Sequence, residues 1–137
     1  MELRIAAVAD YASVSEGGKL NIMGIFGNIF AQAAPATHAQ MFLVFSFEFD
    51  PAESGRKDVK IVLQDDDGRE ILSMGGAVEI ARPAPGQPSV WNQIVTLNAV
   101  TFPRFGAYEF CILINGRVEA RVPLELTQII QPPVPAV

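Results

Sequence analysis

Residues 108–127, which read YEFCILINGRVEARVPLELT, decide the fold class of this chain. Apolar side chains occupy every second position on both sides of Asn115-Gly116, and after that dipeptide they alternate with charged residues. This period of two is typical of a β-strand with one face in a core and the other in water. Asn-Gly favours a tight type I′ turn, because both of its residues must adopt positive φ. The stretch therefore predicts a hairpin of two strands.

Similar strand patterns recur upstream, and turn residues separate them. Residues 3–14 and 20–30 flank Ser15-Glu16-Gly17-Gly18-Lys19, and a third strand is expected over residues 41–49. Residues 59–63 and the strand that resumes at Leu72 flank Asp65-Asp66-Asp67-Gly68, and a proline-rich loop over residues 82–89 precedes a strand at 90–102. The pattern predicts an all-β fold, a single antiparallel β-sandwich of about eight strands over residues 1–130, followed by a proline-rich tail at 131–137.

Two local features carry finer predictions about the strands. Gly75-Gly76 lies inside a predicted strand and indicates a β-bulge there. Pro123 has no amide hydrogen to donate, so the last strand is expected to be an edge or to bulge at that residue.

Composition excludes several classes of partner and location. The 137 residues are 50% apolar and carry a net charge of −5, with the basic residues scattered, so a nucleic-acid partner is not expected. The single cysteine favours a reducing compartment. The chain start lacks the features of a secretory signal, and no apolar run is long enough to span a membrane, so we expect a cytoplasmic protein.

The residues that usually carry catalysis are scarce. A catalytic triad or a zinc site needs several converging histidines or cysteines, whereas the sequence contains only His38 and Cys111. His38 lies in a connector of small residues, and Cys111 lies between Phe110 and Ile112, where a thiol usually packs as an apolar group. The sequence therefore predicts a protein that is not an enzyme and that uses no cofactor.

Acidic residues in two loops leave a second function open, a sandwich domain that binds a small ligand or calcium. Asp65, Asp66 and Asp67 form a run before Gly68, and Asp50 and Glu53 in another loop could complete an inter-loop cation site. Hard cations bind several oxygen ligands, but the spacing of an EF-hand loop is absent. A solvated hairpin turn is the simpler interpretation of the aspartate run.

A stretch without charged residues is the strongest indication of an interaction surface. Residues 20–47 contain no Asp, Glu, Lys or Arg, and both faces of the strands predicted there are apolar. These strands are either central ones covered on both sides or a surface for a protein partner or a second copy, because large exposed apolar patches are rare in monomers. On the second interpretation the interface residues are Ile25, Ile29, Phe42 and Val44.

Two motifs resemble a known family. Asp10-Tyr11-Ala12 with residues 17–26 (GGKLNIMGIF), and later Phe102-Pro103 with residues 106–110 (GAYEF), resemble a bacterial family of short proteins of unknown function. The resemblance implies no reaction, cofactor or site residue. The second motif also resembles the tyrosine corner of immunoglobulin-like sandwiches, in which a tyrosine hydroxyl bonds to nearby backbone. The function expected is a non-enzymatic interaction or structural module, self-associating or part of a larger assembly.

Overall fold

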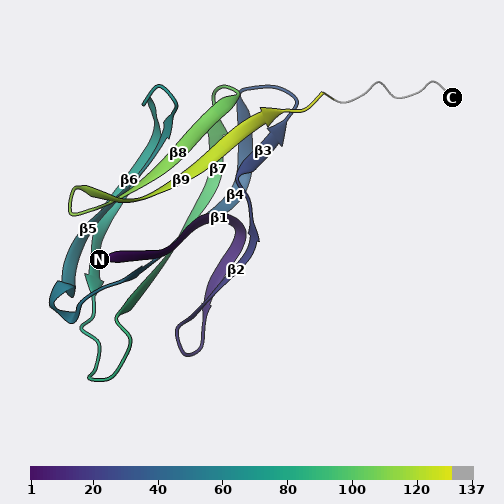
Figure 1. Ribbon diagram of the computed structural model, residues 1–137. Helices are drawn as coiled ribbons and strands as arrows, with labels where there is room; N and C mark the ends of the chain where they lie inside the picture. The colour runs from purple at the N-terminus through teal and green to yellow at the C-terminus, as the bar shows by residue number, and fades with distance from the viewer. Residues whose placement is uncertain (131–137) are drawn as a thin grey trace.

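The computed structural model describes residues 1–130, which form two β-sheets and one short 3₁₀ helix, η1 (Pro51–Glu53) (Figure 1). The predicted tail at 131–137 lies outside the described residues. No helix within the described residues is long and apolar enough to cross a membrane. The strands found over residues 1–130 are β1 (Glu2–Ser15), β2 (Lys19–Ile25), β3 (Asn28–Ala31), β4 (Ala36–Glu48), β5 (Gly55–Asp65), β6 (Glu70–Ile80), β7 (Val90–Phe102), β8 (Gly106–Ile114) and β9 (Arg117–Gln128).

The two sheets are stacked in a sandwich-like arrangement. Sheet A has the order β2-β1-β4-β7, and sheet B has the order β3-β9-β8-β5-β6 and curls into a half-barrel. Alternate side chains of both sheets meet in one apolar core whose largest buried members include Phe45, Phe47, Phe102 and Phe110. The all-β fold class predicted from the sequence is confirmed.

The C-terminal hairpin that decided the fold class forms as predicted. β8 and β9 pair antiparallel from Gly106 to Arg117, and the turn residues Asn115 and Gly116 have φ of 50° and 80°. Asn115 also ties the turn to β5, because its Oδ1 accepts a hydrogen bond from the amide of Asp58 at 2.9 Å. The positive φ of both turn residues is the type I′ requirement that Asn-Gly satisfies.

The expectation of an antiparallel sandwich of about eight strands is confirmed in its sandwich-like arrangement but wrong in one strand pairing. The segment predicted as one strand over residues 20–30 divides into β2 in sheet A and β3 in sheet B, with Gly27 in the connection. β3 pairs parallel to β9, from Asn28 opposite Glu125 to Ala31 opposite Gln128. The chain passes from sheet A to sheet B between β2 and β3. The described residues therefore contain nine strands, and sheet B has both parallel and antiparallel pairs.

Gly75-Gly76 does not form a bulge. Both glycines pair regularly with Lys60 and Val59 of β5, and the register shift lies nearer the turn, between Leu63 and Gln64. A Cβ on Gly75 would lie 2.9 Å from the carbonyl oxygen of Val59. Gly75 therefore permits a close approach of two backbones, which is another reason for a glycine to occur inside a strand.

The position of Pro123 agrees with the prediction of a local edge. Pro123 is paired with Glu109 of β8 on one side, whereas the pairing of β9 with β3 begins only at Glu125. No ladder hydrogen bond is therefore required of a proline at this residue.

Candidate functional site

The hairpin of β1 and β2 folds across the outer face of sheet A. Residues 2–9 of β1 pair with β4, whereas residues 9–15 pair with β2 (Figure 1). The tip of the hairpin reaches β7, because the side-chain amide of Asn92 donates a hydrogen bond to the carbonyl oxygen of Gly18 at 3.3 Å. The hairpin therefore presents one surface to solvent and encloses a space between itself and sheet A.

Four large apolar side chains gather where β1 leaves β4. Met23, Ile25 and Tyr11 are 63%, 61% and 51% exposed, and the Tyr11 and Phe42 rings are in edge contact with centroids 5.4 Å apart. The register places Ile25 and Phe42 on either side of Ala9, and Met23 opposite Tyr11. We call these four residues the apolar corner of sheet A. They form an exposed apolar cluster without a charged member.

Two of the four residues predicted to form an interface lie in the interior instead. Ile29 is 8% exposed in β3 and belongs to the core, and Val44 is fully buried in the centre of β4. β4 lies between β1 and β7 in sheet A, and both Val44 and Phe45, on opposite faces of its middle, are fully buried. Ile25 and Phe42 remain on the surface, and the uncharged stretch thus contains a covered strand, β4, and an exposed one, β2.

Glycine is required at residue 24, near the end of β2. Gly24 has φ of 71°, and a Cβ there would lie 2.5 Å from Oδ2 of Asp10 on the neighbouring strand. We expect Gly24→Ala to lower the free energy of unfolding by roughly 1–3 kcal/mol through the left-handed backbone and the clash. Gly27→Ala is the matched control, because it has no atom within 4 Å and no left-handed φ. Urea denaturation measures both, and equal midpoints for the two variants would contradict this account.

The three aspartates lie in the turn between β5 and β6 and surround the guanidinium of Arg104. Nη2 of Arg104 lies 2.9 Å from Oδ2 of Asp65, 3.2 Å from Oδ2 of Asp67 and 4.0 Å from Oδ1 of Asp66. The carboxylate oxygens of the three aspartates lie within 4.8 Å of one another, a spacing that a metal ion could bridge. The guanidinium of Arg104 fills that place, which favours a structural ion pair over a calcium site.

Asp65 is the buried member of this cluster. Its Oδ1 accepts the amides of Asp67 at 3.0 Å and Arg69 at 2.8 Å. Burial is the largest single influence and opposes the charged form, but the Arg69 amide, the Arg104 guanidinium and the Asp67 amide together hold the pKa of Asp65 below its ordinary value of 3.8. The charged carboxylate is therefore the form that the folded chain stabilises.

Acid should reveal the contribution of Asp65 to stability. A group with a lowered folded pKa stabilises the fold above its unfolded value and loses that contribution as the pH falls through the folded pKa. We expect the Tm of the parent chain to fall below about pH 4, and Asp65→Asn to have a lower Tm at pH 7 and a smaller further fall, measured by circular dichroism. Asp66→Asn, whose side chain is exposed and 4.0 Å from Arg104, should keep the parent profile. Identical profiles for all three chains would contradict the assignment.

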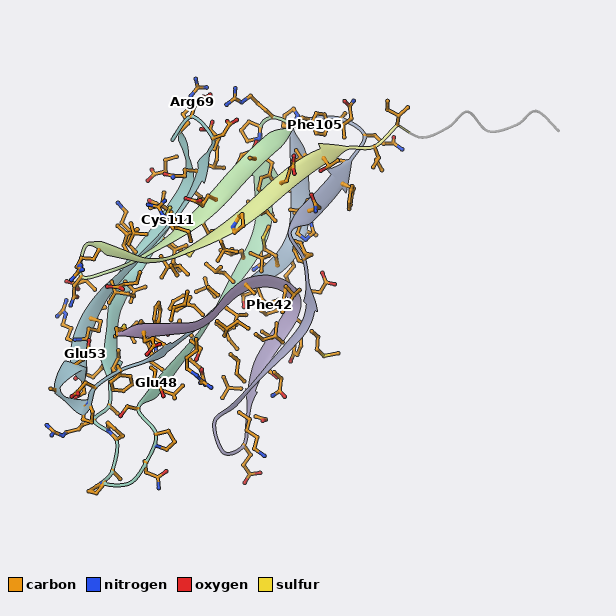
Figure 2. All side chains as sticks on the ribbon, viewed as in Figure 1. Phe42, Glu48, Glu53, Arg69, Phe105 and Cys111 are labelled. Atoms are coloured by element: carbon orange, nitrogen blue, oxygen red, sulfur yellow. The ribbon has the colours of Figure 1, made fainter. Side chains whose placement is uncertain are left out.

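The other predicted acidic residues lie at the opposite end of β5. Asp50 caps η1 by accepting the Ala52 amide, and both carboxylate oxygens of Glu53 contact the amino group of Met1, at 3.2 and 2.9 Å. The 11 residues of β5 separate the two loops by about 35 Å, and Figure 2 shows Glu53 and Arg69 at opposite ends of that sheet. The inter-loop cation site that the sequence left open as an alternative is therefore not formed, because Asp50 and Glu53 lie far from the three clustered aspartates.

The single cysteine and the single histidine of the sequence both contact neighbouring side chains. Cys111 is buried, and burial together with a hydrogen bond to Glu109 raises the pKa of its thiol, which keeps the thiol protonated. His38 lies on β4 with its ring 5.6 Å from that of Phe26.

Two features were missed by the sequence interpretation, and one resemblance is supported. The place of Arg104 among the aspartates depends on a contact 39 residues away, and no local pattern predicts it. The cleft beneath the hairpin was also missed, because it joins segments far apart in the sequence.

The Tyr108 hydroxyl donates a hydrogen bond to the carbonyl of Arg104 at 2.6 Å and accepts one from the Arg104 amide at 3.1 Å, as in a tyrosine corner.

The comparison with family models decides the classification. The model of a family of unknown function, DUF6941, matches residues 4–127. The chain belongs to this family. The match spans both sheets and the whole apolar corner of this DUF6941 member. No curated protein matches the chain significantly.

One solved structure shows a similar fold. The Pseudomonas fluorescens alkylpurine DNA glycosylase AlkC, bound to DNA containing an abasic site analog, is similar with a TM-score of 0.50 at 11% sequence identity. The similarity covers 91% of this DUF6941 chain but 30% of the glycosylase chain. At this identity the likeness shows the fold alone.

Proposed function

We propose that this DUF6941 protein is a non-enzymatic interaction module that forms a homodimer through the apolar corner of sheet A. The observation that carries the proposal is the exposure of Met23, Ile25 and Tyr11 side by side, with Phe42 against them. Monomeric proteins rarely expose contiguous apolar clusters of large side chains, and such clusters mark sites of association.

A second copy is the partner that the charge distribution favours. β2 carries Lys19 as its single charged residue, and β7 carries none, whereas the turns and the outer face of sheet B carry ion pairs such as Arg121 with Glu109. A twofold axis brings the same patch of two copies together, so an uncharged patch meets an uncharged patch. Such an interface buries no unpaired charge, which would otherwise cost free energy.

The same surfaces argue for the other parts of the proposal. Several cations of the described chain, including Arg56, Arg104 and Arg121, are paired with carboxylates, and the net charge of −5 opposes nucleic acid as a partner. The non-enzymatic part of the proposal is supported by the burial of Cys111, the single cysteine of the sequence. No cofactor or membrane contact is part of this function.

Three finer assignments complete the proposal. The hydroxyl of Tyr108 at the start of β8 supports an immunoglobulin-like variant of the sandwich, in spite of the curled sheet B. A single buried cysteine, Cys111, supports a cytoplasmic location in a reducing compartment. The motif resemblance supports a bacterial source.

Sedimentation equilibrium of the purified chain between about 1 and 200 µM tests the proposal. A dimer with a Kd in the micromolar range or tighter supports it, since stable interfaces reach that affinity with a central apolar cluster. A single species of monomer mass over the whole concentration range would refute self-association.

A further inference from the structure

We propose that the cleft beneath the β1–β2 hairpin binds an amphipathic organic anion, meaning an acidic headgroup attached to an apolar body. The cleft has a volume of about 840 Å³ and lies between the hairpin, the outer face of sheet A and the loop before β7. This volume falls within the range of clefts that hold small molecules. The proposal is independent of dimer formation.

The charge of the cleft selects an anion. The four strands of sheet A contain two lysine or arginine residues, Arg4 and Lys19, and both line this cleft, while no aspartate or glutamate does. Within residues 1–130 neither cation forms an ion pair, in contrast to Arg104 and Arg121. Two uncompensated cations in a concave site concentrate negative ligands, and a guanidinium suits the paired oxygens of a carboxylate or phosphate.

A chain of polar contacts holds one of these cations in place. Nη1 of Arg4 donates to Oγ of Ser46 at 3.4 Å, Ser46 donates to Oδ1 of Asn92, and Asn92 donates to the carbonyl of Gly18. These contacts use one of the five N–H groups of the guanidinium, so the others are available to a ligand. The same chain fixes the hairpin tip over β7, which keeps the cleft preformed.

The apolar walls select the remainder of the ligand. Ile5 from β1 and Leu20 and Ile22 from β2 line the same space as the two cations. A hydrated inorganic ion would leave these walls in contact with water, whereas an alkyl or aromatic body would cover them. The headgroup at Arg4 and Lys19 and the body against the isoleucine and leucine side chains together define the ligand class.

Isothermal titration calorimetry with four probes tests the proposal directly. Octanoate and octyl phosphate carry both parts of the ligand, 1-octanol lacks the charge, and inorganic phosphate lacks the apolar body. We expect at least one of the first two to bind with a Kd below about 1 mM, and both 1-octanol and phosphate to bind at least tenfold more weakly. Absence of binding by octanoate and octyl phosphate, or equal binding of 1-octanol, would overturn the proposal.

Variants assign the binding to this cleft. Arg4→Gln and Lys19→Gln should each weaken the tighter probe by about tenfold, a loss typical of one charge-assisted contact. Arg69→Gln, in the turn between β5 and β6, is the matched control and should change the Kd by less than twofold. Ile25→Glu should leave the Kd unchanged, which separates this cleft from the apolar corner. Unchanged binding in both cleft variants, or weakening by Ile25→Glu alone, would assign the ligand to another surface and refute the proposal.

Discussion

Ile25→Glu is expected to convert the dimer into a monomer without unfolding the chain. The Ile25 side chain is 61% exposed in β2, so glutamate there is solvated in the single chain and changes its free energy of unfolding by about 0.5 kcal/mol at most. In the dimer the same carboxylate would meet the apolar corner of the second copy without a partner. The desolvation penalty should weaken the Kd by about 100-fold or more.

Light scattering after size exclusion, together with the Tm of the monomer, measures both parts of this expectation. Val118→Glu provides the control, because Val118 is another exposed apolar residue, on β9 of sheet B. This control should retain the dimer. A dimer of unchanged affinity in Ile25→Glu would show that the apolar corner is not the interface.

Val44→Glu is expected to prevent folding altogether. Val44 is fully buried on β4, and the neighbouring positions in its register are Ala7 of β1 and Ile94 of β7. A carboxylate in this dry environment costs several kcal/mol, which is comparable to the whole stability of a domain of this size. Circular dichroism of the variant should therefore lack a cooperative thermal transition.

The milder Val44→Ala keeps this expectation measurable when the glutamate variant cannot be purified. Removing two buried methyl groups should lower the free energy of unfolding by about 1.5–3 kcal/mol and leave the dimer affinity intact. A folded Val44→Glu chain, or an alanine variant that loses the dimer at full stability, would place Val44 on the surface and contradict the structure.

The difference between Ile25 and Val44 shows what the sequence could and could not predict. Both residues lie in the same uncharged stretch, and apolar residues on both faces of a strand identify it equally as a central strand or as an interface. Which of the two it is depends on strand order, because β4 is flanked by β1 and β7 within sheet A whereas β2 is at the edge. Strand order results from long-range pairing, which period-two patterns do not specify.

Turns were predictable for a local reason. Asn115-Gly116 adopts positive φ because those residue types tolerate it, and this preference acts over two residues. The parallel pairing of β3 with β9 joins residues about 97 positions apart, so no local preference of the sequence predicts it. The ion pair of Arg104 with Asp65 also depends on a long-range contact, and it changed the interpretation of the aspartate run from a solvated turn, with a cation site as the alternative, to a structural ion pair.

Oxidation of methionines by hydroxyl radicals tests the apolar corner most directly, because the probe residues are already present. Met23 is 63% exposed at the corner, and Met41 is fully buried in the core. Mass spectrometry should show Met23 protected at about 200 µM protein and oxidised at about 1 µM, as expected for a micromolar dimer. In Ile25→Glu, Met23 should be oxidised at both concentrations, and Met41 should stay protected throughout. Equal oxidation of Met23 at both concentrations in the parent chain would contradict the assignment of the apolar corner as the surface that joins two copies.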